Sequence, residues 1–303
     1  IKPLNIKNKI ALIGLGSMGY GMASSLLRAG HYVYGFDVAT TNVDRFCNEG
    51  GLRGTIEDVL PTVDIAVIVV LNTAQTESVL FGESGIVQHM KAGTCVISCA
   101  TMGPSTARDL AIRCAQNNIK YLDAPISGGA IKAAAGKLSI MAAGPADTFA
   151  AARPALDAMA ETVFELGDKI GSGSAMKSVN QLLAGVQIAS MGEAMTFGMK
   201  QGIAPEKIVE VITASAGNSW MFENRAPHVV AGDYTPHSAV DIWLKDLGIV
   251  LDIAKTEGFS APITAVAMQQ FIAASESGWG KEDDAAVAKV YARNAGITLP
   301  GVK

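Results

Sequence analysis

Residues 10–19 read Ile-Ala-Leu-Ile-Gly-Leu-Gly-Ser-Met-Gly, and they constrain the fold of this chain more than any other segment. An apolar run ends here in three glycines, at positions 14, 16 and 19. Gly14 permits a tight turn from a strand into a helix, and Gly19 lets that helix lie close to the strand. Gly16 carries no side chain, so a phosphate group can approach the backbone. The segment therefore predicts a strand, a glycine turn and a helix whose N-terminus can receive an anion.

The residues that follow the glycine turn fit the same prediction. A helical pattern covers 21–27, and a second apolar strand at 32–36 ends at Asp37. An acidic residue about 20 positions after the glycines is the expected partner of a ribose hydroxyl in a dinucleotide site. An ordinary strand-to-helix turn is the alternative, but such a turn requires neither the second strand nor the carboxylate.

Asp37 also indicates which dinucleotide binds. Its carboxylate can accept hydrogen bonds from the ribose hydroxyls and would repel a 2′-phosphate. Val38 follows it, where an arginine would be needed to neutralise that phosphate. The sequence therefore predicts NAD as the cofactor.

The first half of the chain alternates apolar strands with helices. Helix-like runs such as 105–117 and 147–160 separate strand-like runs at 10–13, 32–36, 65–71, 95–98, 119–122 and 138–142. This alternation is typical of a parallel sheet that is covered on both faces. The chain has 303 residues, 49% of them hydrophobic, which is enough for two domains. We expect an α/β fold with a doubly wound, mostly parallel Rossmann sheet over residues 1–168.

The pattern changes after residue 168. A polar, glycine-rich break at 168–174 precedes one uninterrupted helical pattern that runs to about residue 200, with no β alternation beyond it. We expect an all-helical second domain over 169–303, opened by a long interdomain helix and used for substrate binding and oligomerisation. The further helical patterns lie at 205–215, 238–257, 262–276 and 283–293. The long helix carries small residues that would let other helices approach closely, namely Ala184, Gly185, Ala189, Gly192, Ala194 and Gly198.

Charge and composition argue against several kinds of partner. The net charge is −4 and no basic tract is present, so nucleic acid is not expected. The apolar segment 182–199 contains Gln187 and Glu193, and it reads as a buried helix rather than a membrane span. The cysteines form no C-x-x-C pair and the histidines no ligand spacing, so we expect reduced thiols and no metal. No signal peptide is visible, so the cytoplasm is expected, although the start at Ile1 leaves a trimmed terminus open.

Three further loops follow strands of the predicted sheet. Ligands of doubly wound folds bind beyond the carboxyl ends of the strands. The site candidates in these loops are Leu71, Asn72, Thr101, Ser127, Gly128 and Gly129. Two glycines after a serine expose consecutive backbone N–H groups, which suit a substrate carboxylate. Helix capping or turn formation is the alternative for Asn72 and Thr101, and a plain surface turn is the alternative for 127–129.

Lys177 is the leading candidate for acid–base chemistry. It lies near the start of the long helix, where the positive end of the helix dipole favours the neutral amine that can accept a proton. Asn180 and Gln181 follow at three and four residues, so they can point to the same side and hydrogen-bond a substrate. A solvated lysine in a loose first turn is the alternative. By periodicity alone, Lys245-Asp246 reads as a solvated pair on the surface of an apolar helix.

Four motifs in order resemble the β-hydroxyacid dehydrogenase family, which includes 3-hydroxyisobutyrate dehydrogenase and tartronate semialdehyde reductase: 14–23, 123–129, 171–177 and 245–247. The resemblance implies that NAD is held by Gly14, Leu15, Gly16, Ser17, Met18, Gly19 and Asp37, with Leu71, Asn72 and Thr101 alongside. It also implies that residues 127–129 bind the substrate carboxylate. In the same way, it makes Lys177 the catalytic acid/base and brings Lys245 to the nicotinamide end.

One position departs from the family pattern. The family commonly has an asparagine four residues after the catalytic lysine, whereas this chain has Gln181, so the substrate pocket should differ. The segment 216–225, with 280–284 and 296–301, is similar to the L-threonate dehydrogenase branch, which oxidises a four-carbon sugar acid. Ser219 and Trp220 are therefore expected to contact the substrate. A capped loop with a core tryptophan is the alternative.

The expected function is NAD-dependent oxidation of a small hydroxy acid by a homodimer or homotetramer. L-threonate, oxidised to 2-dehydro-L-erythronate, is the favoured substrate. A dehydrogenase or reductase of the 3-hydroxyisobutyrate or tartronate semialdehyde type is one alternative. A non-catalytic NAD-binding regulator, which needs neither Lys177 nor 127–129, is another. An imine reductase is disfavoured because many of those enzymes replace the lysine by an acidic or aromatic residue.

Overall fold

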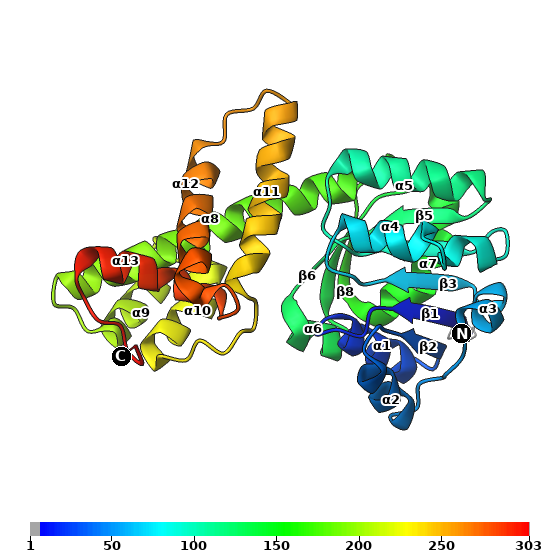
Figure 1. Ribbon diagram of the computed structural model, residues 1–303, viewed down its shortest axis with the longest axis horizontal. Coiled ribbons are helices and arrows are strands. Elements are labelled where there is room, and N and C mark those ends of the chain that lie inside the picture. The colour runs from blue at the N-terminus through cyan, green and yellow to red at the C-terminus, as the bar shows by residue number, and fades with distance from the viewer. Residues whose placement is uncertain (1–6, 303) are drawn as a thin grey trace. The chain divides into compact units, whose positions relative to one another are not determined.

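The computed structural model describes residues 7–302 and divides the chain into two compact units (Figure 1). They are Ile1–Lys177 and Ser178–Lys303, and the division falls inside the long helix α8 (Ser172–Lys200).

A sheet of five parallel strands forms the centre of the first unit, in the order β2-β1-β3-β4-β5. The strands are β1 (Lys9–Ile13), β2 (Tyr32–Phe36), β3 (Ile65–Ile68), β4 (Cys95–Ser98) and β5 (Lys120–Asp123). Their carboxyl ends lie level, because Ile13 pairs with Phe36 and Ile68, and Ser98 pairs with Ile68 and Asp123. The loops after all five strands therefore leave the sheet at one edge. The chain order reverses between β1 and β3, where doubly wound folds bind their ligands.

Helices cover both faces of this sheet, as the doubly wound prediction requires (Figure 1). Side chains of α1 and α7, such as Leu26 and Phe149, bury one face, whereas Leu80 of α4 and Leu110 of α5 bury the other. The predicted fold class is confirmed. The helices of this unit are α1 (Gly19–Arg28), α2 (Thr40–Asn48), α3 (Ile56–Val59), α4 (Thr73–Phe81), α5 (Pro104–Gln116), α6 (Gly129–Ala135) and α7 (Ala146–Met159), with short 3₁₀ turns at Leu60–Thr62 and Ile86–His89.

Two strand predictions need correction. The run at 138–142 is a strand, β7 (Leu138–Ala142), but it pairs in a second sheet with β6 (Ile126–Ser127) and β8 (Ala160–Glu165). Its antiparallel pairing with β6 requires only the short connection through α6, so no crossover back to the main sheet is made. The run at 65–71 ends as a strand at Ile68, because the chain leaves the sheet to begin α4.

The second unit contains only helices among its described residues. Besides the remainder of α8 they are α9 (Pro205–Thr213), α10 (Trp220–Ala231), α11 (Val240–Thr256), α12 (Pro262–Ala274) and α13 (Ala288–Ala295), with short turns η3 (Ser275–Trp279) and η4 (Asp284–Val287). The predicted all-helical composition is confirmed. None of the helices within residues 7–302 combines the length and the apolar character needed to cross a membrane.

Small residues on α8 allow the other helices to approach it closely, as predicted. A Cβ atom at Gly185 would lie 2.7 Å from the Leu247 side chain of α11, and one at Gly198 would lie 2.5 Å from Ile208 of α9. At Gly192 the neighbour is the backbone of Ala288, 3.2 Å away. Glycines therefore set the spacing of the helices around α8.

Candidate active site

The glycine turn after β1 is closed by contacts that only glycine permits. A Cβ at Gly14, whose φ is +101°, would lie 2.0 Å from the carbonyl oxygen of Val69, and one at Gly19 would lie 1.8 Å from that of Gly14. A Cβ at Gly16 would meet nothing within 4 Å. Gly14 and Gly19 are thus required by the turn itself, whereas Gly16 leaves open space where a phosphate group can approach. No side chain caps the N-terminus of α1.

Asp37 is tied to the glycine turn from the end of β2. Its Oδ2 accepts a hydrogen bond of 2.6 Å from the backbone N–H of Leu15, and its Oδ1 accepts one of 2.7 Å from Ala39. Each oxygen has a second lone pair that can accept from a ribose hydroxyl. Val38 is fully exposed and brings no positive charge. This geometry fits the ribose of NAD and opposes a 2′-phosphate.

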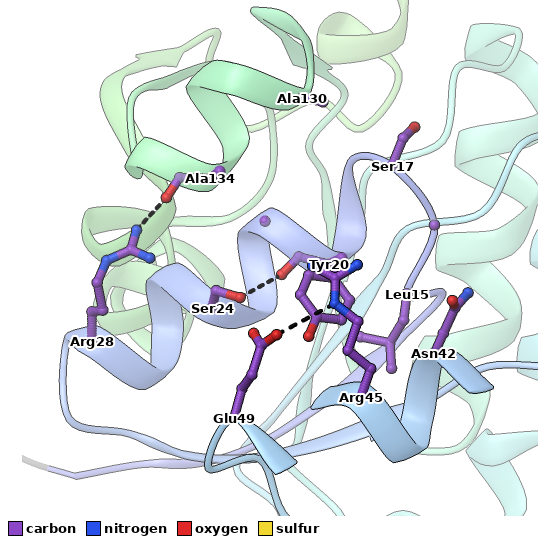
Figure 2. A pocket seen from close by; sticks show the side chains of 12 residues that line it. Leu15, Ser17, Tyr20, Ser24, Arg28, Asn42, Arg45, Glu49, Ala130 and Ala134 are labelled. Atoms are coloured by element: carbon purple, nitrogen blue, oxygen red, sulfur yellow. Dashed lines mark hydrogen bonds and ion pairs between the residues drawn. The ribbon is translucent and has the colours of Figure 1, made fainter. Parts of the chain in front are cut away.

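A pocket of about 580 Å³ opens beside the turn along the outer face of α1 (Figure 2). Leu15, Gly16 and Ser17 belong to its lining, and Arg45 of α2 covers the Tyr20 ring at 4.0 Å. Glu49 pairs with Arg45 at 3.3 Å, so the charge of that arginine is partly balanced. Three of the predicted cofactor residues therefore belong to the lining of this pocket.

The residues after β3 and β4 have structural tasks as well as a place at the sheet edge. Asn72 is the N-cap of α4, and its side chain accepts a 2.9 Å hydrogen bond from the Gln75 N–H. Asn72 therefore caps α4, and its contact with the cofactor stays a prediction. Leu71 is half-exposed, and Thr101, three residues beyond β4, is half-buried.

The segment 127–129 joins a strand of the second sheet to a helix. Ser127 ends β6, paired with Ser139 of β7, and α6 begins at Gly129. Gly128 and Gly129 have φ values of +131° and +76°, a region that favours glycine. The glycines therefore permit an abrupt change from strand to helix, with their backbone at the surface of the unit.

Asp123 at the end of β5 holds the first turn of α8. Its Oδ2 accepts from the backbone N–H groups of Gly171 and Ser174 at 3.0 and 2.9 Å, and its Oδ1 accepts from the Ser174 hydroxyl at 2.7 Å. Gly173 makes this approach possible, because a Cβ there would lie 2.7 Å from the Asp123 carbonyl oxygen. Burial raises the pKa of the Asp123 carboxyl, although the hydrogen bonds from Ser174 and Gly171 oppose the shift.

Lys177 lies three residues beyond this capped turn and is 7% exposed. The alternative of a solvated lysine in a loose turn is therefore wrong. The carboxyl group of Asp123 also lies at this end of α8, where the sequence argument considered only the helix dipole. The sequence argument missed the contact of Asp123 with α8, although Asp123 directly follows the predicted strand at 119–122.

In the second unit, Asn180, Gln181 and Lys245 belong to one polar group around Asp246. Asn180 donates to Gln181 at 2.9 Å, and Gln181 donates to Asp246 at 2.5 Å. Lys245 pairs with the other Asp246 oxygen at 2.9 Å. Asp246 is only 3% exposed, so the reading of Lys245-Asp246 as a solvated pair was wrong. Periodicity missed it because charged residues are assigned to the surface by default.

Ser219 and Trp220 begin α10. The Ser219 hydroxyl is the N-cap and accepts a 3.0 Å bond from the Phe222 N–H. Trp220 is 56% exposed, so it is not the core tryptophan of the alternative reading, and Trp243 is buried instead. Arg225, from the same segment, pairs with the buried Asp284 at 2.5 Å. Burial raises the pKa of Asp284, and the Arg225 charge opposes that shift.

Comparison with known proteins covers both units. Residues 9–167 match the NAD binding domain of 6-phosphogluconate dehydrogenase, and residues 171–291 match the NAD-binding domain of NADP-dependent 3-hydroxyisobutyrate dehydrogenase. L-threonate dehydrogenase of Cupriavidus necator is 47% identical, over 98% of this chain and 99% of its own length. L-threonate dehydrogenase of Escherichia coli K12 is 45% identical, over 97% of each chain. The chain belongs to the β-hydroxyacid dehydrogenase family.

A solved structure supports the same assignment. The 3-hydroxyisobutyrate dehydrogenase of Salmonella typhimurium is 44% identical and has a TM-score of 0.89, over 94% of this chain and all of that one. As a member of the β-hydroxyacid dehydrogenase family, the protein is an NAD-dependent oxidoreductase. The open space at Gly16 and the carboxylate of Asp37 fit the cofactor that the family uses.

Proposed function

We propose that this dehydrogenase oxidises L-threonate at the hydroxyl beside the carboxylate and forms 2-dehydro-L-erythronate. The observation that carries the proposal is the full-length identity of 44–47% to five L-threonate dehydrogenases. 3-Hydroxyisobutyrate is the second candidate, because the Salmonella typhimurium structure at 44% identity bears that name.

The proposed roles follow the chemistry of the residues. The turn 14–19 and Asp37 would hold NAD, with Leu71, Asn72, Thr101 and Lys245 as further contacts. The backbone at Gly128 and Gly129, together with Ser127, would bind the substrate carboxylate. Asn180, Ser219 and Trp220 would face the rest of the acid, and Gln181 would support Asn180 through their hydrogen bond. Their polar groups can donate or accept hydrogen bonds, and half-exposed Trp220 can contact the carbon chain. Such contacts orient a polyhydroxy acid.

Lys177 is proposed as the base. Bound NAD would supply the acceptor for a hydride. In its neutral form, Nζ of Lys177 takes the proton of the substrate hydroxyl while the carbinol C–H bond breaks and the C=O bond forms. The ammonium that forms stabilises the negative charge that develops on that oxygen before the C–H bond has broken, and the reverse transfer serves reduction. Burial of Lys177 supports this role, because a shielded amine exchanges its proton with the substrate rather than with bulk water.

The first test measures NADH formation by the purified protein with L-threonate, 3-hydroxyisobutyrate and glycerate. We expect the highest kcat/KM with L-threonate. Lys177→Ala should lower kcat by about 10²- to 10⁴-fold and leave the Kd for NAD unchanged. Lys169→Ala removes an exposed lysine shortly before α8 and is the matched control.

Two results would contradict the proposal. A Lys177→Ala enzyme that keeps a substantial fraction of kcat would exclude Lys177 as the base. NAD binding without NADH formation from any of the three acids would favour the non-catalytic regulator.

We also propose that the protein is a homo-oligomer, in which α8 supplies part of the subunit contact. Val179, Leu183 and Phe197 are 54%, 52% and 68% exposed. Leu183 and Phe197 are two heptads apart, so they share one face of the helix with Val179. Apolar side chains that line one helix face in this way are typical of a subunit contact.

A further inference from the structure

The amide groups of Asn180 and Gln181 form a chain that ends on a buried carboxylate. Nδ2 of Asn180 donates to Oε1 of Gln181 at 2.9 Å. Nε2 of Gln181 in turn donates to Oδ2 of Asp246 at 2.5 Å. The first two residues lie on α8 and the third on α11, so the chain crosses between two helices of the second unit.

Burial and charge fix the inner end of this amide chain. Asp246 is 3% exposed and Gln181 is 8% exposed. Nζ of Lys245 lies 2.9 Å from the second Asp246 oxygen and forms an ion pair with it. An ionised carboxylate can only accept hydrogen bonds, so it requires the NH₂ group of Gln181 to point toward it.

The orientation of the Gln181 amide determines the orientation of the Asn180 amide. Because its NH₂ group donates to Asp246, Gln181 presents Oε1 to Asn180. Asn180 must therefore donate a hydrogen bond from its own NH₂ group. The carbonyl Oδ1 of the half-buried Asn180 is left as the outer end of the chain. That end accepts a hydrogen bond from a hydroxyl group and repels a carboxylate.

We propose that Asp246 is a positioning residue that sets the direction of this amide chain, and that Asn180 Oδ1 consequently accepts a hydrogen bond from a substrate hydroxyl other than the one oxidised. The second part rests on the proposed oxidation of a sugar acid. It assigns the selection of polyhydroxy acids to Asn180. Gln181, whose amide is bonded at both its oxygen and its nitrogen, serves as the link.

The first test reverses the direction of the hydrogen bonds in the amide chain. Asn180→Asp places an acceptor against Oε1 of Gln181, which cannot rotate while Asp246 holds its NH₂ group. In Asn180→Asp/Asp246→Asn the carboxylate and the carboxamide exchange places. The new carboxamide can then donate to Gln181 Oε1, and Gln181 can donate to the new carboxylate. We expect Asn180→Asp to lower the Tm clearly, and the double variant to recover most of that loss.

The Tm cycle includes two further variants. Asp246→Asn alone allows the hydrogen bonds of the amide chain to run in either direction, and its Tm should lie between those of the wild type and Asn180→Asp. Asp252→Asn changes an exposed carboxylate on α11 and is the matched control. A double variant that is no more stable than Asn180→Asp would overturn the role of Asp246.

The hydroxyl contact is tested with two acids that share the oxidised centre. L-threonate carries extra hydroxyls, and 2-hydroxybutanoate of the same configuration at carbon 2 lacks them. Asn180→Ala should raise KM for L-threonate about tenfold, the value of one hydrogen bond, with kcat and the KM for 2-hydroxybutanoate little changed. Asp246→Ala should likewise raise the ratio of the KM for L-threonate to the KM for 2-hydroxybutanoate.

An equal rise of KM for both acids would show a merely structural role and overturn the contact. The Tm cycle needs no substrate, so it still tests the amide chain if wild-type protein oxidises neither acid. That last outcome would reject the proposed function, and with it the hydroxyl contact, but not the positioning role of Asp246.

Discussion

At the scale of single residues, Asp37 combines two tasks. Its carboxylate accepts the backbone N–H groups of Leu15 and Ala39, so it fastens the glycine turn to the end of β2. The same oxygens are the acceptors proposed for the ribose hydroxyls of NAD. Cofactor preference and turn geometry therefore depend on one side chain.

Asp37→Ala should reduce the preference for NAD. Loss of a charged acceptor corresponds to a rise of about 10- to 100-fold in KM for NAD, and removal of the repulsion should lower KM for NADP. The measurement is kcat/KM for both cofactors at saturating acid. Asp44→Ala, an exposed change on α2, serves as the control. An unchanged ratio of the two kcat/KM values would show that Asp37 does not discriminate.

At the scale of elements, the start of α8 depends on a residue about 50 positions earlier in the chain. Asp123 accepts three hydrogen bonds from Gly171 and Ser174, and it is 1% exposed. Asp123→Ala would leave two backbone N–H groups buried without acceptors, which should lower the free energy of unfolding by about 2–4 kcal/mol. Asp123→Asn keeps an acceptor for both N–H groups and should cost less.

Asp123 also gives stability a pH dependence. Its folded pKa is raised above the ordinary 3.8, chiefly by burial. The folded state thus holds the Asp123 proton at higher pH than the unfolded state does. The contribution of protonated Asp123 to stability is therefore present below about pH 4 and is lost as the pH rises through the folded pKa. Denaturant titrations of the wild type and Asp123→Asn should show the wild type losing stability relative to the variant over that range. A constant difference between the two proteins would contradict the assignment.

The secondary structure was predictable to different degrees from element to element. The five strands of the main sheet and α8 were predicted in the right places because their apolar or helical patterns are uninterrupted, although the predicted strand at 65–71 extends beyond the end of β3. β6 and β8 were missed because β6 has two residues and the side chains of β8 are largely exposed. β7 was recognised as a strand but assigned to the wrong sheet, since its apolar pattern does not identify its pairing partner.

At the scale of the whole molecule, the proposed subunit contact predicts the mass in solution. Light scattering should give at least twice the mass of one chain. Leu183→Glu/Phe197→Glu would place charges on the apolar face of α8 and should reduce the mass to that of one chain. Phe259→Glu changes a side chain that is 66% exposed outside α8 and should leave the mass unchanged. A wild-type mass equal to one chain would reject the proposal.

The sequence by itself determined the glycine turn, the acidic residue after β2, the alternation of strands and helices in the first unit, and the family. These features depend on residues close together in the chain, where backbone freedom, strand and helix periods and a short motif are sufficient. Tertiary structure alone decided that Asp123 caps α8, that Lys177 and Asp246 are buried, and that Gln181 links Asn180 to Asp246. The contacts of Asp123 and Asp246 join segments about 50 to 65 residues apart, and a local pattern carries no information about which distant atoms will satisfy a buried polar group.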